Sequence, residues 1–135
     1  MSFDDSFKAW LRQSLDTAVP ESVRAFSFNL YESGDDDSPF GIDLIGSPHF
    51  DVEDGDWACE EVWEATPRWL PIPATFSTNS WQACLANVKA LVLRALEDKG
   101  IGETFRGREG IAVGFVDGDL DLVWQSQVVQ CAASD

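Results

Sequence analysis

Positive charge is scarce in this chain of 135 residues. Nine Lys and Arg stand against 24 Asp and Glu, which gives a formal net charge of −15 at pH 7. The shortage is uneven, because no Lys or Arg lies between Arg24 and Arg68, and none follows Arg108. A chain this acidic is repelled by the phosphate backbone of nucleic acids and by anionic membrane surfaces. Direct nucleic-acid binding and membrane-surface binding are therefore rejected as functions.

Cysteines and long apolar runs are also few. Cys59, Cys84 and Cys131 have no spacing typical of a metal site, and their odd number favours reduced thiols. No apolar run has the length needed to cross a bilayer, and the N-terminus lacks the basic-then-apolar pattern of a secretion signal. These absences predict a cytoplasmic protein.

Motifs that carry catalysis are missing too. The only histidine, His49, has no nucleophile and no further metal ligand near it in sequence. The acidic stretch DVEDGD, residues 51–56, places its glycine at the fifth position, whereas a calcium loop needs it at the sixth. There is no glycine-rich phosphate loop and no serine elbow. We predict no catalytic residue, no metal site and no cofactor.

The chain nevertheless contains enough apolar residues for a folded core. Hydrophobic residues make up 44% of it and aromatic residues 12%, which suits a single domain over 1–135 without disulfides. Apolar residues three and four apart predict an N-terminal helix from Ser2 to about Ala18 and one long helix over about 80–98. The stretch GIGETFRGREG that follows is expected to be a loop, because glycines interrupt it.

Alternating patterns predict the strands. VRAFSFNLYE and FGIDLIGS each place alternate apolar residues on one face, which favours a hairpin of half-buried strands. WACEEVW, residues 57–63, fits either a strand or a helix, and we interpret it as a strand. TPRWLPIPATF has three prolines within seven residues, so it can form at most an edge strand.

A second hairpin is predicted in GIAVGFVDGDLDLVW, residues 110–124. Asp117-Gly118 suits a two-residue turn, which would place Phe115 opposite Leu120. In that register Leu122 completes an apolar face, while Asp119 and Asp121 point to solvent. The predicted fold class is α+β: a mainly antiparallel sheet of four to five strands, with the N-terminal helix and the long helix packed on it.

The base-free middle of the chain is the candidate binding region. It combines many acids with tryptophans, and opposite charge accelerates protein encounter while aromatic anchors supply affinity. An alternative is that the tryptophans are core residues and the acids maintain solubility. The predicted partner-binding residues are Asp35, Asp36, Asp37, Asp51, Glu53, Asp54, Asp56, Trp57, Glu60, Glu61 and Trp63.

WACEEVW and GIAVGFVDGDLDLVW resemble segments of the small acidic bacterial immunity proteins of polymorphic toxin systems. The resemblance implies a cytosolic domain that blocks a toxin, often a basic nuclease, and it assigns no functional residue by position. We therefore expect a non-catalytic protein that neutralises a basic protein partner. Two alternatives stay open: a nucleic-acid mimic that regulates a DNA-binding protein, and a small-ligand or enzyme domain that uses clustered carboxylates.

Overall fold

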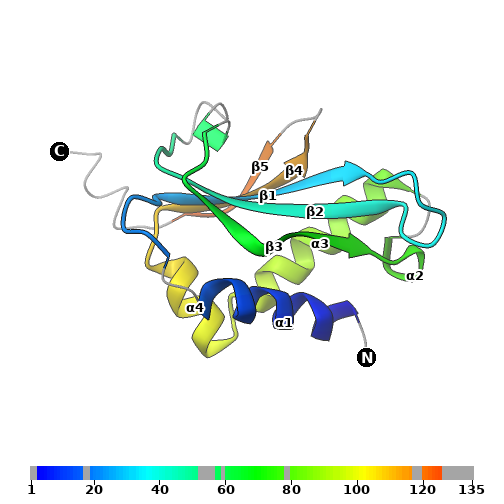
Figure 1. The fold of residues 1–135 in the computed structure, drawn as a ribbon, viewed down its shortest axis with the longest axis horizontal. Helices are drawn as coiled ribbons and strands as arrows, with labels where there is room; N and C mark the ends of the chain where they lie inside the picture. The colour runs from blue at the N-terminus through cyan, green and yellow to red at the C-terminus, as the bar shows by residue number, and fades with distance from the viewer. Residues whose placement is uncertain are drawn as a thin grey trace.

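The computed structural model describes residues 3–16, 19–51, 57–58, 60–77, 80–116 and 120–125. In this part of the chain a five-stranded sheet carries helices on one of its faces (Figure 1). The elements in chain order are α1 (Phe3–Asp16), β1 (Ala25–Glu32), β2 (Phe40–Ser47), β3 (Trp63–Ile72), α2 (Ala74–Ser77), α3 (Trp81–Ala95), α4 (Lys99–Arg106), β4 (Gly110–Phe115) and β5 (Leu120–Gln125).

The sheet is mixed, with strand order β3-β2-β1-β4-β5. The pair β1 and β4 is parallel, whereas the other three pairs are antiparallel. The α+β class and the N-terminal helix are confirmed, but the description of the sheet as mainly antiparallel missed the parallel pair in its interior. The chain leaves the edge strand β3, passes through the helices and returns beside β1 in the same direction as β1. Such a crossover connection is what a parallel pair requires.

The helical region after residue 80 differs from the predicted single long helix. Ser80 caps α3, since its Oγ accepts a hydrogen bond from the Ala83 amide at 3.2 Å, and α3 ends at Ala95. A second helix, α4, occupies the predicted loop. Asp98 caps it by accepting from the Ile101 amide at 3.2 Å, and Ile101 and Phe105 are buried four residues apart. Burial of these two side chains outweighs the poor helix propensity of the glycines in α4.

The main core lies between the helices and the sheet. Phe26, Phe28 and Leu30 of β1 alternate along the strand and are fully buried on the helix side. Phe105 of α4 meets Phe26 edge-to-face at a centroid distance of 4.7 Å. None of the described helices combines the length and the apolarity that crossing a membrane requires.

The register of β4 with β5 corrects the predicted hairpin. Ile111 pairs with Trp124 as expected, but Ala112 then pairs with Leu122 and Val113 with Asp121. A bulge next to the Ile111–Trp124 pair shifts the register by one residue, which places Leu120, Asp121 and Leu122 on the faces opposite to those predicted. Asp121 therefore lies on the helix side, where its Oδ2 pairs with Nζ of Lys89 on α3 at 2.5 Å, while its side chain stays 44% exposed. The predicted turn at Asp117-Gly118, and Asp119, lie outside the described residues.

The segment before β3 is also different from the prediction. Residues 57–58 form a short 3₁₀ turn, and the strand begins only at Trp63, so the interpretation of residues 57–63 as a strand was wrong. The edge-strand prediction for TPRWLPIPATF is confirmed as far as Ile72, because β3 is the outermost strand of the sheet. The short helix α2 follows at Ala74.

Candidate protein-binding surface

The face of the sheet turned away from the helices is the candidate site (Figure 1). Residues directly opposite each other in neighbouring strands share a face, so the strand registers define two rows that run across all five strands. The first row is Leu120, Gly114, Asn29, Asp43 and Trp69. The second row is Leu122, Ala112, Ser27, Ile45 and Glu64. We call these ten residues the open face.

The exposed apolar side chains of the open face lie at its two edges, whereas Ser27, Ile45 and Ala112 at its centre are buried. Trp69 on β3 is 56% exposed and Leu122 on β5 is 40% exposed. These two strands are four strand spacings apart, or about 19 Å. Between them Asn29 is half-buried, and its Oδ1 accepts a hydrogen bond from Ser27 Oγ at 2.7 Å. Gly114 adds no side chain to the first row and is itself buried.

Arg68 joins three carboxylates at the β3 side of the open face. Its Nε donates to Asp43 Oδ1 at 2.9 Å and its Nη2 to Asp43 Oδ2 at 3.2 Å, which is the two-point geometry that suits a guanidinium. Nη2 also donates to Glu61 Oε1 at 3.0 Å, and Nη1 lies 3.4 Å from Glu64 Oε2. One cation shared by three carboxylates leaves a local net charge of −2. We call these four residues the Arg68 cluster.

The electrostatics of the cluster favour the charged guanidinium. The hydrogen bond to Asp43 is the main reason that the pKa of Arg68 is raised above its ordinary value, with Glu61 adding to the effect. The Arg68 Cζ also lies 5.4 Å from the centroid of the Trp69 ring, within range of a cation–π contact. Arg68 therefore connects the exposed indole to the acidic side chains.

Trp57 and Trp63 lie on opposite faces of the sheet. Trp57 is only 7% exposed and packs edge-to-face on Phe50, with a centroid distance of 5.4 Å, over Ala25 and Ala112. Trp63 is half-buried on the helix side, where it meets Phe26 edge-to-face at 5.6 Å. The expectation of two indoles exposed together is therefore corrected. Trp57 instead covers one end of the face opposite the helices.

The predicted acidic residues do not form one cluster. Asp35, Asp36 and Asp37 are exposed in the β1–β2 connection, whereas Glu60 and Glu61 are exposed just before β3. These two groups lie at opposite ends of β1 and β2, strands of eight residues that span about 27 Å. Asp51 is exposed on the connection after β2, which leaves the sheet at the same end as Glu60 and Glu61. Three further predicted residues lie outside the described residues: Glu53, Asp54 and Asp56.

Sequence reasoning missed four residues of this surface, namely Asn29, Asp43, Arg68 and Trp69. Two signals could have found some of them. Asp43 interrupts the apolar strand FGIDLIG at the position that alternation turns away from Phe40, Ile42 and Leu44. Arg68 is the first cation after the long base-free interval, so many carboxylates compete for it.

Comparison with protein-family models, curated protein sequences and solved structures finds no match to this chain. Within the described ranges, no three His, Cys, Asp or Glu side chains are grouped as a metal ion would need. Inferences about function therefore rest on the geometry of the chain itself.

Proposed function

We propose that this protein is a non-catalytic acidic binding protein of the cytoplasm that neutralises a basic protein partner, as an immunity or inhibitor protein does. The exposed side chains of the open face, Trp69, Leu122 and Glu64, form the binding surface together with the Arg68 cluster. The observation that carries the proposal is the exposed indole of Trp69 in contact with Arg68, which also holds Asp43, Glu61 and Glu64.

Each part of this surface has a distinct physical task in binding. Trp69 offers a large rigid side chain that loses its remaining contact with water on docking, which is typical of an interface hot spot. The surplus carboxylates attract Lys or Arg side chains, and the net charge of −15 raises the rate of encounter with a basic protein. Of the residues predicted from the sequence, Glu61 stays in the proposed surface, while Trp69 takes the anchoring role expected of Trp57 and Trp63.

The test is affinity capture from the native cell, followed by titration of the captured basic protein against two matched variants. Trp69→Ser removes the indole of the open face. Trp81→Ser removes an indole that is similarly exposed, at 51%, but lies at the start of α3. Loss of a hot-spot Trp costs 2 kcal/mol or more, so we expect Trp69→Ser to weaken binding by about 30-fold and Trp81→Ser to change it little.

Three outcomes would contradict the proposal. Equal affinities for the two variants would remove the open face from the interface. Binding that is unchanged between low and high salt would remove the role of the carboxylates. Competition by duplex DNA for the same site on the partner would favour the nucleic-acid mimic instead.

A further inference from the structure

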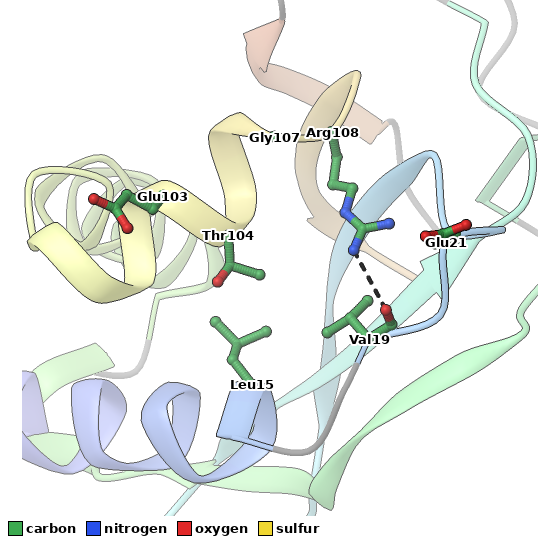
Figure 2. Close-up of a pocket in the computed structure, with 7 residues that line it drawn as sticks. All are labelled: Leu15, Val19, Glu21, Glu103, Thr104, Gly107 and Arg108. Carbon is green, nitrogen blue, oxygen red and sulfur yellow. Dashed lines mark hydrogen bonds between the residues drawn. The ribbon is translucent and has the colours of Figure 1, made fainter.

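A cavity of about 570 Å³ lies on the helix side of the molecule, between the end of α1, the α1–β1 connection and the last turn of α4. Its volume is in the range of small-molecule sites. Leu15 and Val19 supply apolar walls, and Thr104 and Arg108 supply polar ones. In Figure 2 the side chains of Leu15, Thr104 and Arg108 converge on the same space, whereas the carboxylate of Glu103 is directed away from it.

Only some of the N–H donors of the Arg108 guanidinium form hydrogen bonds within the described residues. Its Nη1 donates to the carbonyls of Pro20 and Val23, each at 2.9 Å, and its Nη2 donates to the carbonyl of Val19 at 3.4 Å. A guanidinium has five N–H groups, so Nε–H and one Nη2–H have no acceptor among the described residues. Figure 2 shows that the side of the guanidinium carrying Nε faces Thr104 across the cavity.

Arg108 differs from most arginines of this chain in having no carboxylate partner among the described residues. Acids outnumber cations by 24 to nine in this chain, and four other arginines, Arg12, Arg24, Arg68 and Arg94, form ion pairs. Arg106 also bonds a backbone carbonyl, that of Leu96, but it is not among the cavity residues. Within the described part of the chain Arg108 has no ion pair, although Glu21 lines the same cavity.

We propose that the cavity binds a small organic monocarboxylate with a short apolar chain. The carboxylate accepts the Nε–H and Nη2–H of Arg108 that have no acceptor among the described residues, since these donors match the spacing of its two oxygens. The apolar chain lies against Leu15 and Val19. Glu21, which lines the cavity, disfavours a second negative charge on the ligand, so we expect a tricarboxylate not to bind. This proposal does not depend on the open face.

The test is an NMR titration of the full chain with hexanoate, with hexylamine and citrate as controls. We expect the Arg108 Nε–H and Thr104 amide resonances to shift and saturate with hexanoate only. Glu21→Gln removes one repelling charge and should tighten binding about twofold to threefold, while Arg108→Gln should weaken it at least about tenfold. Trp69→Ser should bind hexanoate as the wild type does, which separates this site from the open face.

Arg108→Gln also removes hydrogen bonds to the α1–β1 connection, so its loss of binding could have a structural cause. The titration of the wild-type protein is therefore decisive by itself. Hexylamine that shifts and saturates the same two resonances, with hexanoate leaving them unmoved, would overturn the proposal and assign the cavity to cations. Linear shifts with no saturation, or tighter binding of hexanoate by Arg108→Gln, would also overturn it.

Discussion

Replacing Arg68 by Met should destabilise the fold, because Asp43 would lose its counter-ion while staying largely out of water. The Asp43 side chain is 12% exposed and the Arg68 side chain 26% exposed. Removing one partner of a fully buried ion pair costs about 3–5 kcal/mol, and the partial exposure of Arg68 reduces this figure. We therefore expect a loss of about 2 kcal/mol. With a urea m-value of about 2 kcal/mol/M, the unfolding midpoint should fall by about 1 M.

The assay is equilibrium urea unfolding of Arg68→Met, Asp43→Asn and the double variant. Because the unpaired carboxylate causes the penalty, the double variant should be more stable than the sum of the two single losses predicts, with a coupling of about 1–2 kcal/mol. Arg94→Met is the matched control. Its ion pair with Asp4 spans 3.0 Å between side chains that are 50% and 43% exposed, so its loss should cost less than about 1 kcal/mol.

The reasoning would be refuted if Arg68→Met and Arg94→Met lost the same small amount of stability. It would also be refuted by additive losses in Arg68→Met and Asp43→Asn, because the two groups would then not interact in solution.

Three further predictions test other parts of the fold. Leu122→Ser should change the free energy of unfolding by no more than about 0.5 kcal/mol, since this side chain is 40% exposed. If Leu122 instead lay in the core, as in the register predicted from the sequence, the loss would be about 2–5 kcal/mol. Urea unfolding of the variant distinguishes the two registers. Phe26→Ala should cost about 3–5 kcal/mol by the same assay, because the ring is fully buried between Phe105 and Trp63, and a loss below 1 kcal/mol would contradict this core. Burial raises the pKa of the Cys84 thiol to about 12, so its protonated form stabilises the fold below pH 9 and this contribution is lost as the pH rises toward 12. Cys84 should accordingly react with iodoacetamide only after unfolding. Rapid alkylation of the native protein would show that the apolar face of α3 that carries Cys84 is not buried.

The spacing of apolar residues predicted the helices and strands that bury one face along their own length. The apolar stripe of α3 and the alternation of Phe26, Phe28 and Leu30 require burial on one side whatever their partners are. The parallel pairing of β1 with β4 could not be predicted in this way, because alternation along a strand does not identify its neighbour. The register of β5 was wrong for a similar reason: a single-residue bulge between Leu122 and Trp124 changes the face of Leu120, Asp121 and Leu122 without leaving a clear sign in the sequence.

Helix α4 was not predicted because the glycines in its sequence are typical of a loop. Its glycines disfavour a helix, while the Asp98 cap and the buried pair Ile101 and Phe105 favour one. The pair stabilises the helix only once the sheet is present to cover it. Trp57 was misplaced because a continuous strand was assumed from Trp57 to Trp63, and the turn at residues 57–58 breaks that alternation.

The outward position of Asp43 follows from the alternation in β2, but its pairing with Arg68 depends on the register of β2 with β3. That register is irregular between Asp43 and Ile45, and the irregularity brings Arg68 within reach of Asp43, Glu61 and Glu64 together. Arg68 thus supports both the sheet edge and the proposed binding surface, so Arg68→Met should lose stability and partner affinity together. Trp69 is the most exposed of the described Trp side chains, so Trp69→Ser should lose affinity with little change in stability. A Trp69→Ser protein that unfolds as readily as Arg68→Met would mean that the indole belongs to the fold, and the binding surface would then have to be sought elsewhere.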